Sequence, residues 1–234
     1  MNRRRKLNNA ELPDFPYKMV EEVTASIEEY EKFLDFYSRF YKYNIVNALM
    51  IYGQNPDAAA VGTYEQWKSK TVERGVRKGA FPIKILQGQA WETAFDIGDT
   101  YGKAFTYKNS YTLTEQEKEK LISAFGLTDR AGSLDERIMK FAIDGTARRM
   151  QELFHENENF KSHFRQQAAL IGYSAFQLIK SRYHLDYEVS KERMDFASFQ
   201  AVSAFDKINV LQYVQPLVKN AILEMDKGIA RMLE

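Results

Sequence analysis

The hydrophobic residues of the chain recur with two different spacings, and the spacing changes along its length. From Tyr17 to about Phe40, apolar side chains return every three or four residues, which predicts an amphipathic helix. A second helical stretch covers about 44–52. The turn sequence Gln-Asn-Pro-Asp at 54–57 ends it, because the residue before a proline disfavours helical backbone.

Short apolar segments after this turn predict a small sheet. The predicted strands are 58–62, 83–86 and 92–97. The last two can pair antiparallel across the turn between them. Thr63 and Gln66 have the spacing of a capping box, which predicts a short helix that carries Trp67. The stretch 74–79 contains two glycines and is predicted to be a loop.

Beyond residue 112 the pattern is helical. Capping boxes at 114–117 and 133–136 mark two helix starts. The helices predicted in this half are about 114–126, 133–156, 160–184 and 206–233. The fold class is therefore α+β, with a small, mostly antiparallel sheet and flanking helices followed by a helical C-terminal layer. The predicted regions are a flexible basic arm (1–16), an α/β region (17–126) and a helical region packed on it (133–234).

Composition narrows the class of protein. At 234 residues the chain can bury a core of one large or two small domains. It has no cysteine, which excludes disulfides and thiolate metal sites and suits a cytoplasmic protein. No apolar run approaches the roughly 18 residues that a membrane span needs, so no membrane partner is expected. The basic start of the chain has no apolar stretch after it and is not a secretion signal.

Charge is segregated although the net charge is only +1. Between Glu11 and Asp35 there are eight acidic residues against two lysines, a net charge of −6. Between Gln66 and Leu86 there are six cations against one glutamate, a net charge of +5. Any nucleic-acid surface must come from this kind of local segregation.

The cationic stretch is the strongest candidate for a binding site. Arg74, Arg77 and Lys78 adjoin Gly75 and Gly79, so the backbone can approach a ligand while the cations reach phosphate oxygens. A cationic groove with aromatic faces is typical of proteins that hold single-stranded nucleic acid. The predicted nucleic-acid-binding residues are Arg74, Arg77, Lys78, Lys84, Trp67, Tyr64, Asn47 and Tyr52. Trp67 or Tyr64 would stack on a base or support the loop.

Two other classes of function stay open. An inhibitor that docks on a host restriction or CRISPR nuclease could mimic DNA phosphates with acidic side chains. Its candidate residues are Glu21, Glu22, Glu28, Glu29 and Glu31. A metal-dependent nuclease could use Asp96 and Asp99, because carboxylates suit divalent cations. We expect no enzyme activity, catalytic residue, metal or cofactor. His155-Glu-Asn-Glu-Asn lacks the second histidine of a metalloprotease HExxH motif.

One stretch carries a family signature. The chain reads Asn47-Ala-Leu-Met-Ile-Tyr-Gly-Gln54, then Asn55-Pro-Asp-Ala, and continues with a set of single matching positions. These are Val61, Tyr64, Trp67, Arg74, Val76, Lys78, Gly79, Ile83 and Ile85. Phe95-Asp-Ile-Gly-Asp-Thr-Tyr-Gly102 follows. This pattern resembles the N-terminal domain of ArdC-type antirestriction proteins, which also occurs in polyvalent proteins of phages and conjugative elements.

The resemblance implies binding of DNA, single-stranded DNA in particular, by a protein that enters a new host with a mobile element. Such a protein would counter restriction or other host defence systems. ArdC proteins also carry a metalloprotease-like domain, which is not expected here. At two positions where the family pattern has glycine, this chain has Glu73 and Pro82.

Overall fold

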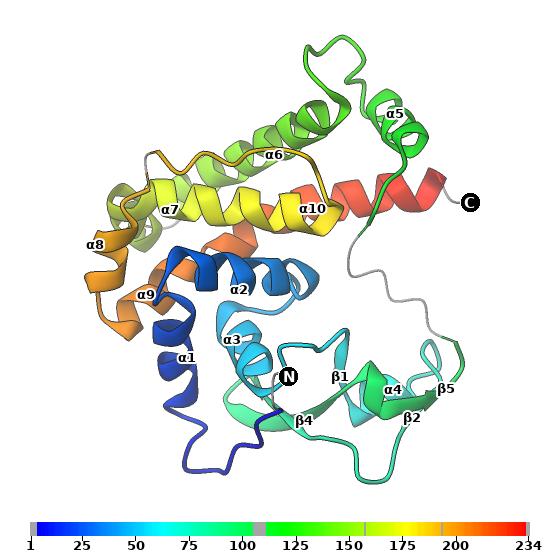
Figure 1. Cartoon of the computed structure of the whole chain (residues 1–234), viewed down its shortest axis with the longest axis vertical. Helices are drawn as coiled ribbons and strands as arrows, with labels where there is room; N and C mark the ends of the chain where they lie inside the picture. The colour runs from blue at the N-terminus through cyan, green and yellow to red at the C-terminus, as the bar shows by residue number, and fades with distance from the viewer. Residues whose placement is uncertain (1–3, 105–110, 157, 193, 233–234) are drawn as a thin grey trace.

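The computed structural model describes residues 4–104, 111–156, 158–192 and 194–232 (Figure 1). The predicted α+β class is confirmed. The helices in these residues are α1 (Phe15–Val23), α2 (Ile27–Arg39), α3 (Ile45–Gln54), α4 (Tyr64–Lys68), a 3-10 turn (Ile97–Asp99), α5 (Glu115–Ala124), α6 (Leu134–Glu156), α7 (Glu158–Tyr183), α8 (Phe196–Ala201), α9 (Ala204–Leu211) and α10 (Val214–Met232). The strands are β1 (Val61–Thr63), β2 (Arg74–Val76), β3 (Ile83–Gln87), β4 (Ala90–Asp96) and β5 (Thr100–Gly102).

The strands form two antiparallel sheets. The first has the order β1-β4-β3, and its β3–β4 hairpin confirms the pairing predicted for the segments 83–86 and 92–97. The second sheet pairs β2 with β5. Residues 74–76 were predicted as part of a loop, and this was wrong. Their partner strand lies about 25 residues later, so the pairing is not visible in local sequence.

Two amides of α3 close the outer edge of β3. Asn47 donates from Nδ2 to the Leu86 carbonyl (2.8 Å) and accepts from the Leu86 N–H (2.7 Å). Gln54 makes the same pair of bonds with the Lys84 carbonyl (2.9 Å) and N–H (2.8 Å). Its Nε2 also donates to the Met50 carbonyl (2.8 Å). We call these two side chains the amide clamp. They provide hydrogen-bond partners for backbone N–H and C=O groups that would otherwise be unpaired at the edge of the sheet.

The spacing of the clamp follows from helix and strand geometry. Asn47 and Gln54 are seven residues apart, so they lie on one face of α3, about 10 Å apart along its axis. Lys84 and Leu86 are two residues apart on β3, roughly 7 Å. The two amides must therefore converge by about 3 Å to meet Lys84 and Leu86. Gln54 can do this because helix side chains lean toward the N-terminus of the helix and glutamine is one methylene longer than asparagine.

The helical layer packs on the front region through α2, which lies along α7 (Figure 1). The hydroxyl groups of Tyr30 and Ser174 join the two helices by a 2.5 Å hydrogen bond. The helix predicted from Tyr17 to Phe40 is two helices, because Ser26 leaves helical geometry and caps α2. The helix predicted over 206–233 is likewise divided between α9 and α10.

The N-terminal arm was expected to be flexible over residues 1–16. Residues 1–3 lie outside the described residues. From residue 4 onward the arm packs on the molecule, since Leu7 and Leu12 are buried and the Arg5 N–H donates to the Gln54 carbonyl (2.9 Å). These apolar contacts hold the segment.

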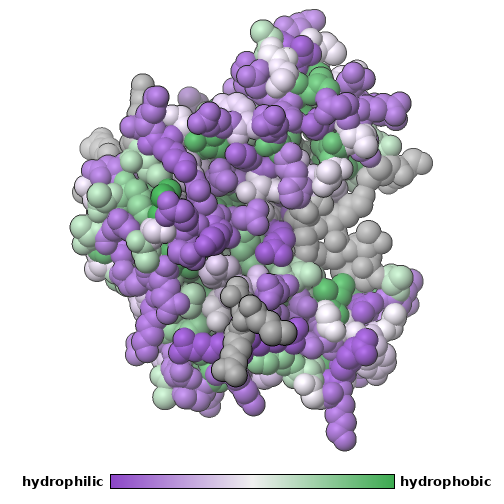
Figure 2. All heavy atoms as spheres, in the orientation of Figure 1, coloured by the Kyte–Doolittle hydropathy of each residue, from purple (hydrophilic) through white to green (hydrophobic). Residues whose placement is uncertain are grey.

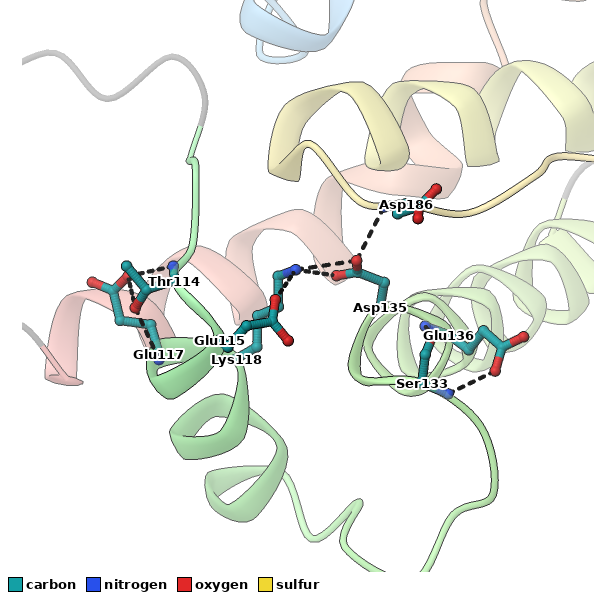
Figure 3. A network of polar contacts seen from close by, with 8 residues as sticks. All are labelled: Thr114, Glu115, Glu117, Lys118, Ser133, Asp135, Glu136 and Asp186. Atoms are coloured by element: carbon teal, nitrogen blue, oxygen red, sulfur yellow. Dashed lines mark hydrogen bonds and ion pairs between the residues drawn. The ribbon is translucent and has the colours of Figure 1, made fainter.

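A polar network joins α5 and α6 to the chain after α7 (Figure 3). The Lys118 ammonium group lies 2.8 Å from Glu115 and 2.9 Å from Asp135, and Asp135 accepts from the Asp186 N–H (3.2 Å). The capping boxes predicted at 114–117 and 133–136 are both present beside this network. Among the described residues, every helix is too short or too polar to cross a bilayer.

We predict that the amide clamp contributes strongly to stability. Asn47→Ala leaves the outward N–H and C=O of Leu86 without partners, so the free energy of unfolding should fall by about 2–4 kcal/mol. Urea unfolding followed by circular dichroism measures this. Asn47→Leu restores volume but not hydrogen bonds and should be about as destabilising. Asn220→Ala, on an exposed position of α10, should change stability by less than about 0.5 kcal/mol. Asn47→Ala with near-normal stability would contradict the assignment.

Candidate nucleic-acid interface

The two-stranded ribbon of β2 and β5 presents an aromatic ring on its surface. Gly75 is the register partner of Tyr101, so the two residues share one face of the ribbon. A Cβ atom on Gly75 would lie 2.6 Å from Cζ of Tyr101, which shows that the ring lies directly across this glycine. Tyr101 is 56% exposed. Glycine is therefore required here for the approach of a tyrosine ring, and the ring remains accessible to a ligand.

Three cations lie on or just after β2. Arg74 donates from Nε to the Thr100 hydroxyl (2.7 Å) and from Nη1 to the Lys103 carbonyl (2.5 Å). Arg77 is exposed, and among the described residues its guanidinium group donates from Nε to the Thr100 carbonyl (3.1 Å). Lys78 is exposed in the next turn. Because strand side chains alternate, Arg77 falls on the same face as Gly75 and its partner Tyr101.

Helix α4 adds a second exposed ring beside the ribbon. Tyr64 is 43% exposed, and the Lys68 ammonium group lies 4.7 Å from the centre of its ring. A hydrogen bond to the Tyr64 hydroxyl raises the pKa of Lys68 above its ordinary value. The Tyr101 hydroxyl acts on the pKa of Lys68 in the same direction. Two tyrosines and several cations thus share this end of the molecule.

A family model matches the front part of the chain, which contains the ribbon. A family model described as the N-terminal domain of the anti-restriction factor ArdC matches residues 15–139, which is more than half of the chain. The chain belongs to this family. The match contains the three-stranded sheet and the ribbon, and it ends inside α6. Neither a curated protein nor a solved structure matches the chain.

Two residues of the ArdC-type pattern serve the fold. Asn47 was predicted to bind nucleic acid; in the structure both polar atoms of its amide are bonded to Leu86, and the residue is buried. Trp67 is only 4% exposed, and its indole N–H donates to the Phe95 carbonyl (3.0 Å). Trp67 therefore joins α4 to β4; its two predicted roles were to stack on a base or to support the loop.

Lys84 and Tyr52, also predicted to bind nucleic acid, lie away from the ribbon. Lys84 is on β3, and its ammonium group donates across the hairpin to the Thr93 hydroxyl (2.8 Å). Tyr52 packs its ring against Phe33 and Phe36 of α2, with ring centres 5.5 and 5.0 Å away. Both side chains thus make their described contacts with elements other than the ribbon. Residues that are close in the sequence can lie on different elements and face different sides of the molecule, and the sequence alone does not show which side.

Sequence reasoning did not single out Tyr101. The residue lies in the Phe95-to-Gly102 segment of the family pattern, but no local signal shows that it is exposed. The signal that could have found it is cross-strand pairing with Gly75, since aromatic residues commonly cover glycines on a neighbouring strand. That pairing becomes visible only when β2 is recognised as a strand.

Glu73 occupies a backbone conformation that favours glycine. Its φ angle is +51°, in the left-handed region, which explains why the ArdC-type pattern has glycine at this position. Its carboxylate lies 3.5 Å from the Lys103 ammonium group in an exposed ion pair. Glu73 thus adds local strain and one negative charge at the start of β2.

The two aspartates considered as nuclease residues have structural partners: Asp96 accepts hydrogen bonds from backbone N–H groups, and Asp99 forms an ion pair. Asp96 is 5% exposed and accepts from the N–H groups of Ala59 (2.7 Å), Ala60 (3.1 Å) and Gly98 (2.9 Å). Asp99 pairs with Arg4 at 2.8 Å. In the part of the chain that the structure describes, no group of three or more metal-ligating side chains occurs.

The acidic residues of the inhibitor hypothesis are divided between α1 and α2. Three of the five have lysine partners: Glu21 pairs with Lys207, Glu29 with Lys32 at 2.6 Å, and Glu31 with Lys191 at 2.5 Å. Glu22 and Glu28 are exposed. Partial neutralisation weakens any resemblance to a row of phosphates. On the face seen in Figure 2, hydrophilic side chains predominate and hydrophobic ones form small, separate patches.

We predict that Glu73→Gly is tolerated or stabilising. Relief of the left-handed strain outweighs the added freedom of the unfolded chain, so the free energy of unfolding should stay the same or rise by up to about 1 kcal/mol. Thermal unfolding measures this. Glu73→Gln, which removes the same charge but keeps the strain, is the matched control and should not be stabilised. A loss of more than about 1 kcal/mol in Glu73→Gly would contradict the strain assignment.

Proposed function

We propose that this chain binds single-stranded DNA on the β2–β5 ribbon and that binding serves an antirestriction function. Membership of the ArdC N-terminal family supports the antirestriction function. The observation that carries the choice of ligand is the exposed Tyr101 ring held across Gly75, with the exposed cation Arg77 two residues further along the chain. A base stacked on such a ring gains about 1–3 kcal/mol without sequence preference.

The cations of the ribbon suit a phosphate backbone. Among the described residues, the Arg77 guanidinium group uses one of its five N–H donors, and we propose that its terminal nitrogens reach phosphate oxygens. Its one bond to the Thr100 carbonyl orients the guanidinium group before a ligand arrives. Lys78 adds a mobile positive charge in the adjacent turn. These groups neutralise phosphates, and Tyr101 and Tyr64 offer ring faces to the bases.

The proposed setting is the cytoplasm of a host that a phage or conjugative element has entered. The chain would act there by binding, without catalysis, metal or cofactor. A host restriction or CRISPR nuclease remains a candidate protein partner. We favour DNA as the ligand, because the ribbon cations make no ion pair with the acids of α1 and α2 among the described residues. The inhibitor hypothesis predicts the opposite experimental outcome, namely nuclease binding without DNA.

We predict that Arg77→Glu/Lys78→Glu weakens binding to a labelled oligothymidine by at least tenfold. Each phosphate contact contributes about 0.7 to the slope of log affinity against log salt for single strands, so the slope should become shallower by about 1.4. Fluorescence anisotropy at rising salt measures both. Lys219→Glu/Lys227→Glu makes the same charge change on α10 and should affect binding far less. Equal effects of the two variants would remove the ribbon assignment.

A stacking role for Tyr101 is tested separately from charge. Tyr101→Ala should weaken binding of the same oligothymidine by about 5- to 150-fold and leave the salt slope unchanged, because stacking involves no counterion release. Tyr17→Ala removes a tyrosine of α1 with comparable exposure (40%) and serves as the control. If both variants bind like the parent protein, Tyr101 does not stack on bases.

A further inference from the structure

A recess of about 400 Å³ lies between β1, α4 and the chain before α3. Its described lining is Lys42, Tyr43, Ala60, Val61, Gly62, Gln66, Trp67 and Val72. This volume is within the range of sites that take small organic groups. The recess adjoins the ribbon, because Val72 is two residues before Arg74 and their Cα atoms are therefore within about 7 Å.

The aromatic walls of the recess are fixed. The Tyr43 hydroxyl donates to the Val61 carbonyl (2.7 Å), and the Trp67 indole N–H donates to the Phe95 carbonyl (3.0 Å). At Gly62, a Cβ atom would lie 3.3 Å from the Trp67 ring, so this glycine allows the close approach of the ring. A site with two held rings and small apolar neighbours favours a flat, apolar-faced group.

Two polar groups at the recess are available to a ligand. The Gln66 amide uses its oxygen to accept from the Thr63 N–H (2.8 Å), and its nitrogen has no partner among the described residues. The Lys42 ammonium group is exposed, 5.9 Å from the Tyr41 ring centre, and is in no ion pair with those residues. The recess therefore offers one hydrogen-bond donor and one positive charge beside its aromatic walls.

We infer that this recess holds one unstacked nucleobase of the strand that binds the ribbon. The walls match the flat face of a base, the Gln66 amide nitrogen donates to a base acceptor, and Lys42 neutralises a neighbouring phosphate. This inference rests on the proposed function. A recess that took an apolar side chain of a protein would not need the donor and the cation.

Trp67 supplies a direct readout. The chain has two tryptophans, so Trp91→Phe leaves Trp67 as the only indole fluorophore. Oligothymidine should quench Trp67 fluorescence on binding, whereas an oligomer of the same length with abasic units should not. Anisotropy of a labelled strand reports binding in the same samples. Binding of oligothymidine without quenching would overturn the recess assignment and leave the proposed function standing, whereas no binding would overturn both.

Gln66→Glu tests the donor without disturbing the fold, since glutamate at this position also completes a capping box. In the Trp91→Phe background it should reduce the preference for thymine over abasic strands by about fivefold or more. Gln116→Glu makes the same change on the exposed face of α5 and should leave the preference unaltered. Val72→Phe, which fills the recess, should abolish the quenching. Quenching and preference unchanged in both recess variants would contradict the inference.

Discussion

The fold of the front region depends on two side-chain amides that complete the edge of a strand. Asn47 and Gln54 present to β3 the donors and acceptors that a further strand would supply. This joins α3 to the three-stranded sheet by directional bonds as well as by apolar contact. It also prevents the edge from pairing with another chain. Two residues of the ArdC-type pattern, Asn47 and Gln54, thus have a role in the architecture of the sheet.

The ribbon of β2 and β5 is a separate sheet from the one that the amide clamp joins to α3, and it is the proposed ligand-binding surface. Its two arginines, Arg74 and Arg77, bond to backbone and hydroxyl groups of β5 and its flank, and these contacts orient the guanidinium groups without neutralising them. Tyr101 remains exposed because its partner is glycine. The oriented arginines, the exposed Tyr101 ring and the aromatic recess beside the ribbon all lie within the part of the chain that matches the family.

Local patterns in the sequence predicted much of the fold. The β3–β4 hairpin, the three capping boxes and the helical rear half depend on neighbouring residues, and the structure confirms them. The strand character of residues 74–76 and the exposure of Tyr101 depend on a distant pairing, so local sequence could not give them. The bonding of Asn47 to a strand edge likewise depends on a distant residue, Leu86. A polar residue on an apolar helix signals an interaction, but not whether its partner is a ligand or a strand edge.

We propose that the amide clamp maintains the fold and that the ribbon binds single-stranded DNA. Titration of isotopically labelled protein with oligothymidine, followed by NMR, tests both parts in one spectrum. The backbone amides of Gly75, Arg77 and Tyr101 should shift progressively, while the side-chain amide signals of Asn47 and Gln54 should stay in place. Shifts at the two clamp amides with an unperturbed ribbon would contradict the account.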